Sequence, residues 1–174
     1  MCYTLERAET TVSVPEFIKA CIDIPKFLEC CKLCPNYTKR WSCPPFDFDP
    51  MEIWNRYRTL RLHALILKPD GCDSKALMAG FWKEKPKFDH WLLEMERQNP
   101  GSYALSGGSC SFCKECQKIQ GNPCCHPDWL RYSVEALGGD VGKTMELYFG
   151  KPIVWAQEDQ TPAYLMLVGG LLLP

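Results

Sequence analysis

The residues with the clearest chemical potential are the cysteines of the stretch GSCSFCKECQKIQGNPCCHP, residues 108–127. Cys110, Cys113 and Cys116 follow one another at intervals of three, and Cys124 lies eight positions further on. Two consecutive C-x2-C spacings let three thiolates turn inward from one tight loop, and a fourth thiolate can then close a cage. Because a [4Fe–4S] cluster needs four thiolates around one compact body, we predict that these four cysteines hold such a cluster.

A structural zinc ion is the main alternative for these thiols. Zinc sites usually take one C-x2-C pair from each of two turns that lie about a dozen to twenty residues apart. Pairing Cys31 and Cys34 with Cys113 and Cys116 leaves a spacer of 78 residues, which is far longer. Three thiols at two consecutive x2 spacings are also less typical of a single ion, so the cluster is favoured over zinc.

A second cysteine-rich stretch, CCKLCPNYTKRWSCPPFDFDP, occupies residues 30–50. Its motif thiols are Cys31, Cys34 and Cys43. Three thiolates can hold a [4Fe–4S] cluster with one open iron, which is a substrate-binding arrangement. Sources of a fourth ligand are Cys2, Cys21, Cys30 and the cysteines of the second stretch. The spacing alone therefore predicts one cluster or two.

Three residues beside the motif cysteines are expected to stay outside the ligand set. Cys30 and Cys125 each adjoin a motif cysteine, and neighbouring side chains usually diverge. His126 is expected to cap a helix or donate a hydrogen bond to cluster sulfur, although histidine does replace cysteine at some metal sites. The remaining thiols are expected to be small buried or incidental groups: Cys2, Cys21 and Cys72.

Length and composition indicate an ordinary globular protein apart from its cysteines. The chain has 174 residues, enough to bury a core, and we predict one cysteine-rich metal-binding domain over residues 1–174. The net charge is -1 and no long basic run is present, so neither nucleic acid nor a membrane surface is an expected partner. Twelve cysteines in a chain that does not need disulfides to fold favour metal or redox chemistry in the reducing cytoplasm.

No segment of the sequence is expected to enter a membrane. The N-terminal residues lack a basic region followed by an apolar stretch, so they do not resemble a secretory signal. The most apolar segment, AYLMLVGGLLLP, has eleven residues before its proline, which is too short to span a bilayer. We therefore expect a cytoplasmic protein.

The elements that must position the cysteines are visible as hydrophobic patterns. Residues 15–29 predict two short helices separated at Pro25. The segment TLRLHALILKP, residues 59–69, predicts a strand buried on both faces. Ser74 is expected to cap a helix that runs to about Lys83, and Pro86 is expected to start a second one.

The C-terminal half continues this alternation. SYALSGG, residues 102–108, predicts a short strand that leads into the second cysteine stretch. Pro127 is expected to open a helix that Gly138 and Gly139 end, and Asp140 to cap another. The segment AYLMLVGGLLL predicts a final strand or strand pair. This order indicates an α/β (or α+β) fold: a small mixed sheet with helices packed on it, and both cysteine loops close together at strand ends.

The cysteine motifs resemble those of a known family. CKLCPNYTKRWSCPPFDFD, GSCSFCKECQKIQGNPCCHP and SVEALGGDV together are similar to a prokaryotic family of unknown function described as predicted metal-binding proteins. The resemblance covers roughly residues 12–150, and relatives more often carry a basic residue where this chain has Cys125. It implies metal binding, without a reaction, by the seven motif cysteines: Cys31, Cys34, Cys43, Cys110, Cys113, Cys116 and Cys124.

Three kinds of function are consistent with these features. The first is electron transfer by one or two [4Fe–4S] clusters, with the chain acting as a redox accessory subunit for a partner protein. The second is an enzyme that uses an open iron of a three-cysteine cluster as a Lewis acid or in sulfur chemistry. The third is an interaction module stabilised by zinc. No general base is recognisable beside either cysteine stretch, which favours electron transfer or metal binding over catalysis.

Overall fold

The computed structural model describes residues 2–154 and 160–174. Its strands and helices alternate along the chain, and two short 3-10 turns lie in the second half. In chain order the elements are β1 (Tyr3–Ser13), α1 (Val14–Cys21), α2 (Ile24–Lys32), α3 (Met51–Trp54), β2 (Thr59–Pro69), α4 (Ser74–Gln98), β3 (Tyr103–Leu105), η1 (Gln117–Gln120), η2 (Pro127–Trp129), α5 (Val141–Phe149) and β4 (Leu165–Leu173).

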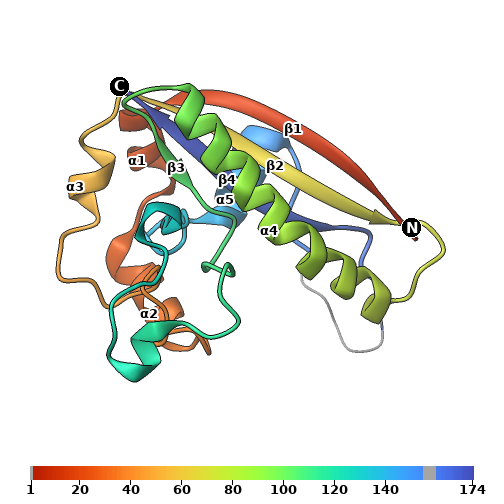
Figure 1. Cartoon of the computed structure of the whole chain (residues 1–174). Coiled ribbons are helices and arrows are strands. Elements are labelled where there is room, and N and C mark those ends of the chain that lie inside the picture. The colour runs from red at the N-terminus through yellow and green to blue at the C-terminus, as the bar shows by residue number, and fades with distance from the viewer. Residues whose placement is uncertain (1, 155–159) are drawn as a thin grey trace.

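The strands form one four-stranded sheet in the order β1-β2-β4-β3 (Figure 1). All three neighbouring pairs are antiparallel, so the sheet is not mixed, although the α/β class is confirmed. The predicted strand over residues 59–69 is β2, and the C-terminal apolar segment forms a single strand, β4. Since β4 lies between β2 and β3, it joins the long β1–β2 pair to the short strand that leads into the second cysteine stretch.

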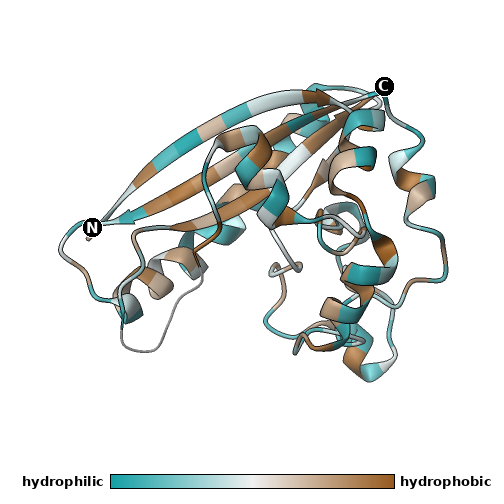
Figure 2. Cartoon of the chain, turned by 180° about the vertical axis from the view of Figure 1, so that it is seen from behind, coloured by the Kyte–Doolittle hydropathy of each residue, from teal (hydrophilic) through white to brown (hydrophobic). Residues whose placement is uncertain are grey.

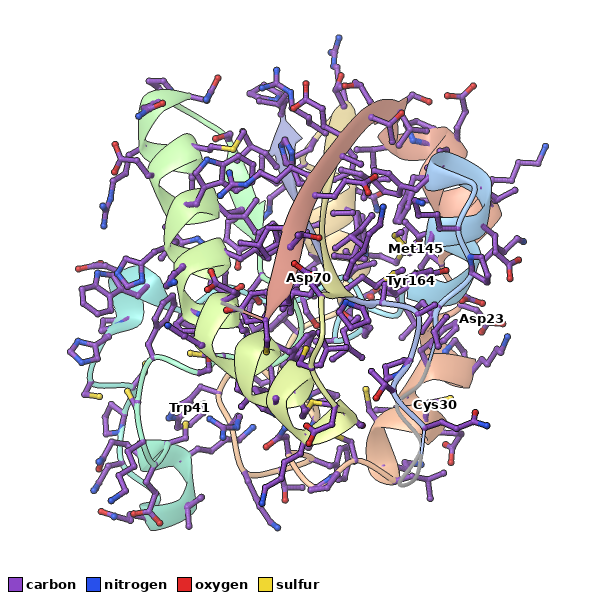
Figure 3. The ribbon with its side chains drawn as sticks, turned by 90° about the vertical axis from the view of Figure 1, so that its right-hand side faces the viewer. Asp23, Cys30, Trp41, Asp70, Met145 and Tyr164 are labelled. Atoms are coloured by element: carbon purple, nitrogen blue, oxygen red, sulfur yellow. The ribbon has the colours of Figure 1, made fainter. Side chains whose placement is uncertain are left out.

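Helices cover both faces of this sheet, as Figure 3 shows with α4 on one side and α5 on the other. Because side chains alternate along a strand, Leu60 and Leu62 of β2 pack into the cluster that contains α1 and α5. Leu65 and Leu67 pack into a second cluster with Phe88 of α4. The apolar strands between these layers are visible from behind in Figure 2. Two cores therefore hold the sheet, and the predicted burial of β2 on both faces is confirmed.

Strand β1 is not among the sequence predictions. It pairs along its whole length with β2, from Tyr3 opposite Pro69 to Ser13 opposite Thr59. Most of its residues between Tyr3 and Val12 are exposed or half-buried, as is usual for a polar strand at a sheet edge. The hydrophobic alternation that marks a strand is therefore weak here.

Helix α4 runs through the position where two helices were expected. It spans 25 residues with Pro86 inside it, and its N-cap is Asp73, whose side chain accepts from the Ala76 N–H, rather than Ser74. A proline withholds one N–H from the helix and usually ends or bends it. Here burial of Phe88 and Leu92 against the sheet, and an ion pair from Lys85 across the proline, stabilise the continuous helix.

The helix predicted from Pro127 is wrong beyond its first turn. Residues 127–129 form a 3-10 turn, and the chain then runs alongside β3, where the Ser106 N–H donates to the Tyr132 carbonyl at 3.0 Å. The Arg131 guanidinium donates to Glu96 of α4, which holds the segment in place. These tertiary contacts replace helical hydrogen bonds that the local sequence would otherwise favour.

Two other predicted features of the helices are confirmed. The two short helices expected over residues 15–29 are α1 and α2, but the break between them lies at Ile22 and Asp23, and Pro25 lies in the first turn of α2. Asp140 is the N-cap of α5, and its side chain accepts from the Lys143 N–H at 2.9 Å. Across the described residues, none of the helices combines the length and apolarity needed to cross a membrane.

Candidate metal centre

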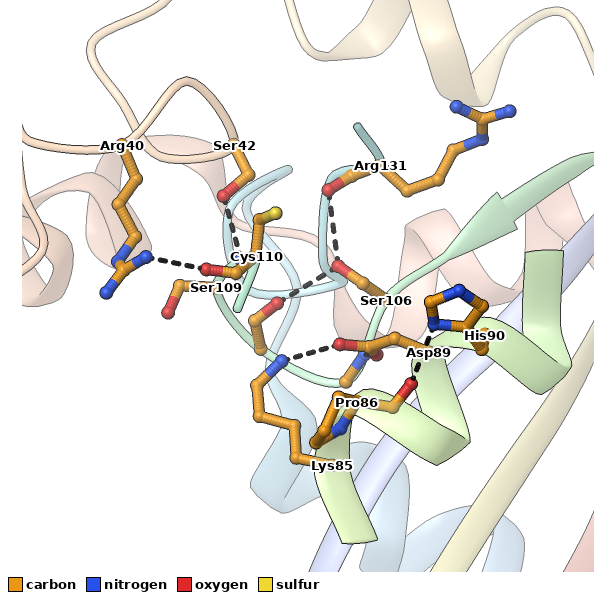
Figure 4. A network of polar contacts seen from close by, with 12 residues as sticks. Arg40, Ser42, Lys85, Pro86, Asp89, His90, Ser106, Ser109, Cys110 and Arg131 are labelled. Atoms are coloured by element: carbon orange, nitrogen blue, oxygen red, sulfur yellow. Dashed lines mark hydrogen bonds and ion pairs between the residues drawn. The ribbon is translucent and has the colours of Figure 1, made fainter. Parts of the chain in front are cut away.

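The two cysteine-rich stretches lie against each other, as expected. We call residues 30–50 the first loop and residues 108–127 the second loop. The Arg40 guanidinium donates to the Cys110 carbonyl at 2.8 Å, and the Cys110 N–H donates to Ser42 Oγ at 2.9 Å (Figure 4). Lys118 Nζ of the second loop donates to the Cys43 carbonyl at 3.2 Å. The backbone at two motif cysteines therefore takes part in joining the loops.

The elements that deliver the two loops differ in kind. The second loop follows β3, so its predicted place after a strand is confirmed. The first loop begins within helix α2, which carries Cys30 and Cys31, so the expectation of a strand end is wrong for it. All twelve cysteines, both inside and outside the loops, are free thiols.

The first loop arranges its thiols around a cavity of about 600 Å³. Cys31 is half-buried, Cys34 is exposed and Cys43 is buried, and all three line the cavity together with Cys30. Burial, reinforced by the neighbouring thiols of Cys43 and Cys34, raises the pKa of Cys31 to about 11. Burial also raises the pKa of Cys43. A metal bound here would displace the thiol protons, so its affinity depends on pH.

A carboxyl group that sequence reasoning missed lines the same cavity. Glu135 is half-buried as a residue, but its Oε2 atom is inaccessible to solvent and has no hydrogen-bond partner in the structure. Burial raises the pKa of this carboxyl. In the sequence Glu135 lies inside the family-like stretch SVEALGGDV, within the helix predicted from Pro127, and nothing there marked it as a site residue. The structure thus places an acidic group beside the first loop.

The second loop brings three ligand atoms to one point. The donor atoms of Cys113, Cys125 and His126 all lie within 4.8 Å of one another, and the two sulfur atoms are 3.4 Å apart. Among the described residues, no other group of three or more Cys, His, Asp or Glu side chains has its ligand atoms this close together. The hydrogen bond to Cys125, followed by burial, raises the pKa of Cys113 to about 11.

The expected and observed groupings of the second loop overlap in one residue. Cys113 was a predicted ligand, whereas Cys125 and His126 were expected to remain outside the set. Of the neighbouring Cys124 and Cys125, it is Cys125 whose sulfur lies 3.4 Å from that of Cys113. The other motif thiols of this loop are half-buried: Cys110, Cys116 and Cys124.

Aromatic rings fix the orientation of His126. Its imidazole stacks on the ring of Trp129 with the centroids 4.7 Å apart and the planes 17° from parallel. Trp129 in turn contacts Phe112 and His90 edge-on, at 5.6 Å and 5.3 Å. Groups that hold a metal-binding histidine in one orientation strengthen its binding because less freedom is lost on coordination.

A buried ion pair of helix α4 supports the start of the second loop (Figure 4). Lys85 Nζ lies 2.7 Å from Asp89 Oδ2, and both side chains are almost completely buried. The other carboxylate oxygen of Asp89 accepts from the Gly107 N–H at 2.8 Å. This arrangement satisfies the buried carboxylate and anchors the backbone three residues before Cys110.

One comparison with known proteins finds a match. A family model described as predicted metal-binding protein (DUF2284) matches residues 21–173. The chain belongs to this family. Both cysteine loops lie within the matched part. No curated protein and no solved structure matches the chain.

Proposed function

We propose that this metal-binding protein is an iron–sulfur protein whose [4Fe–4S] cluster is held by the first loop. The observation that carries the proposal is the spacing of Cys31, Cys34 and Cys43. These thiols line one cavity, yet among the described residues they do not gather within 4.8 Å as the second-loop group does. Thiolates around a multi-iron cluster stand further apart than ligands of a single ion, because the cluster body lies between them.

The second-loop group is better matched to a single tetrahedral ion such as zinc. With metal–sulfur bonds of 2.3 Å, two thiolates on a tetrahedral ion stand about 3.8 Å apart. The 3.4 Å between the sulfur atoms of Cys113 and Cys125 is close to this value. His126 supplies a third donor, and Cys110 and Cys124, whose charges act on Cys113, are candidates for a fourth. A cluster held by the four spaced cysteines of this loop is the competing proposal.

Electron transfer to a redox partner protein is the role that we propose for the cluster. Cys34 is exposed, so one edge of the first-loop site is accessible to a docked protein. The cluster would supply one-electron chemistry. The chain itself would contribute the thiolates, their partial burial and the hydrogen bonds that hold the loops together. A cytoplasmic location fits free thiols and an oxygen-sensitive centre.

The metal content of the protein tests this assignment. Anaerobic purification should yield about four iron and four sulfide per chain, together with one zinc. Cys34→Ser should then remove the iron and sulfide but not the zinc, and Cys113→Ser should do the reverse. Cys72→Ser, at a half-buried thiol outside both loops, serves as the control and should change neither. One zinc without sulfide would refute the cluster, and eight iron with eight sulfide would refute the single ion.

An enzyme with an open iron is a second candidate, and the cavity favours it. The first loop offers three motif thiols, and Glu135, a half-buried acidic residue, lines the same cavity. The Glu135 carboxyl is therefore a candidate general base, which could not be recognised from the sequence. Spectroscopy of the purified cluster separates the two roles, because exogenous thiolate or cyanide perturbs an open iron but leaves a fully cysteine-ligated cluster unchanged.

A further inference from the structure

Strand β1 forms a long outer edge of the sheet. It has 11 residues and pairs with β2 on its inner side, and it borders the sheet in Figure 1. Every second residue of such a strand directs its backbone N–H and C=O away from the neighbouring strand. In the described part of the chain, no second backbone segment is hydrogen-bonded to this outer side. We propose that β1 pairs with β1 of a second copy of the chain, which joins two sheets into one across a two-fold axis.

This edge lacks several features that usually prevent strands from pairing. Exposed edges are normally short, interrupted by a bulge or a proline, protected by lysines, or covered by another segment. Strand β1 keeps an unbroken register with β2 from Tyr3 to Ser13 and contains neither proline nor lysine. The opposite edge is the three-residue strand β3, and just beyond it Ser106 forms a bridge with Ser133. Among the described residues, the sheet thus has one short, partly covered edge and one long edge available to a partner.

The charges of β1 complement themselves in one register. An antiparallel pair centred on Ala8 overlaps the whole strand and places Arg7 of each copy opposite Glu9 of the other. Opposite charges at such positions stabilise strand pairs, since their Cβ atoms lie about 4.5–5.5 Å apart. Within the chain, the exposed Arg7 lies over the ring of Trp91. The exposed Glu9 faces His63, whose pKa burial lowers to about 4, so this imidazole is neutral at neutral pH. The second copy would supply each with an opposite charge.

The same charges disfavour the neighbouring registers. Side chains must stay on the same face of the joined sheet, so the centre of the pair moves in steps of one residue. A pair centred on Arg7 would set the two arginines opposite each other, and a pair centred on Glu9 would do the same to the two glutamates. Like charges directly opposite each other are destabilising. The strand therefore specifies pairing about Ala8.

The remaining positions of the overlap are compatible with this register. Leu5 is a large hydrophobic residue that is 44% exposed, and Thr11 of the second copy would lie opposite it. Glu6 is already paired with Lys68 at 2.5 Å and would lie opposite the uncharged Thr10. Like charges therefore face each other nowhere along the overlap.

The oligomeric state of the full chain tests the pairing. Sedimentation velocity over a range of concentrations should show a monomer–dimer equilibrium. A chain still monomeric at about 100 μM, where an interface of micromolar affinity is saturated, would overturn the proposal. Hydrogen exchange on the same dilution series locates the interface, because amides of residues 3–13 should exchange more slowly as the dimer forms. Unchanged exchange of this segment on dimerisation would also overturn it.

Charge reversal tests the register. Arg7→Glu and Glu9→Arg each place like charges opposite each other twice in the symmetric dimer, so each should weaken dimerisation about tenfold. Mixed in equal amounts, the two variants should regain the wild-type affinity, because each supplies the charges that complement the other. Arg56→Glu, at an exposed arginine between α3 and β2, is the matched control and should leave the affinity unchanged.

The mixture keeps the test independent of the stability of either variant. Circular dichroism shows whether each variant folds, and recovery on mixing cannot arise from the fold of one chain alone. Single reversals without effect, or a mixture that dimerises no better than its components, would mean that another surface forms the dimer. Either result would contradict the pairing of β1.

Discussion

His126 shows how a single residue can be prepared for a metal by its neighbours. Its imidazole lies flat on Trp129, and its ligand atom lies within 4.8 Å of two sulfur atoms. Both His126 and Cys125 are exposed, so an ion can reach them without opening the core. The same exposure means that the second-loop group is accessible to chelators.

Replacing His126 tests this group directly. His126→Ala should weaken Co²⁺ binding at the second loop at least about tenfold, because one of three clustered donors is lost. The absorption bands of cobalt in a thiolate site report the affinity. Cys72→Ser is the control and should leave the titration unchanged. An unaltered titration in His126→Ala would show that the ion uses other ligands.

His63 is a second residue whose environment has a measurable consequence. It is buried in the middle of β2 against Trp91, and its Nε2 atom has no hydrogen-bond partner. Burial lowers the pKa of this imidazole to about 4, with Arg61 and Arg7 acting in the same direction and Glu9, 3.6 Å away, against it. The folded protein therefore keeps His63 neutral at pH values where the unfolded chain is protonated.

Acid should destabilise the fold through His63. The unfolded chain takes up a proton near pH 6.5, whereas the folded chain does so near pH 4, so stability is lost as the pH falls between these values. The free energy of unfolding should decrease by up to about 3 kcal/mol over this window. Urea denaturation at several pH values measures it. The decrease should persist in His90→Gln, an exposed position, and be absent in His63→Leu; an equal decrease in His63→Leu would contradict the assignment.

Strand β4 is the element on which the architecture depends most. Its register places Gly169 opposite His63 of β2 and Gly170 opposite Leu105 of β3. At Gly169 a Cβ atom would lie 2.5 Å from the Leu105 carbonyl oxygen and 2.6 Å from the Leu92 side chain. Helix α4 and β3 therefore approach β4 as closely as they do because this position has no side chain.

Gly169→Ala should accordingly weaken the sheet. The added methyl group meets backbone that cannot easily move, so the free energy of unfolding should fall by about 1–3 kcal/mol. Chemical denaturation provides the measurement. Gly142→Ala in α5, where the nearest atom is the Asp140 carboxylate at 3.2 Å, is the matched control and should be neutral or slightly stabilising. Equal stability of Gly169→Ala and the wild type would contradict this packing.

Elements with strong hydrophobic patterns were predictable, and those that depend on distant contacts were not. The apolar run of β2 and the cap at Asp140 are local signals, and both predictions are confirmed. The continuity of α4 through Pro86 depends on burial against the sheet, which the local sequence does not reveal. The extended course after Trp129 likewise depends on hydrogen bonds to β3 and α4.

The same distinction applies to the candidate site. Cysteine spacing identified both loops, and their contact is confirmed through Arg40, Ser42 and Cys110. Which thiols come together is a question of loop conformation, so the grouping of Cys125 with Cys113 could not be read from intervals along the chain. Glu135 had no distinguishing pattern because a buried acidic side chain looks like a surface one in sequence.

At the scale of the whole molecule, the sheet and the cysteine loops are stabilised by different interactions. The sheet carries buried apolar clusters on both faces, whereas the loops are connected by a few polar contacts to backbone carbonyl and amide groups. Segments with few apolar contacts open more readily than a packed core. Metal bound at the loops should therefore stabilise them locally.

Removal of the metal should affect the loops selectively. After chelation, amide hydrogen exchange should accelerate within residues 30–50 and 108–127, while the amides of β2 and β4 remain protected. Mass spectrometry of the exchanged protein, before and after chelation, distinguishes these segments. Loss of protection across β2 and β4 would show instead that the metal is required for the sheet itself.

The central position of β4 also determines when the metal centre can be assembled during synthesis. Every loop cysteine leaves the ribosome before β4 does, yet β3, which leads into the second loop, pairs with β4 in the described sheet. A nascent chain therefore displays the nine thiols of the two loops before their scaffold exists. Metal delivery is consequently expected after translation, and the emerging chain needs a reducing environment until its final strand is in place.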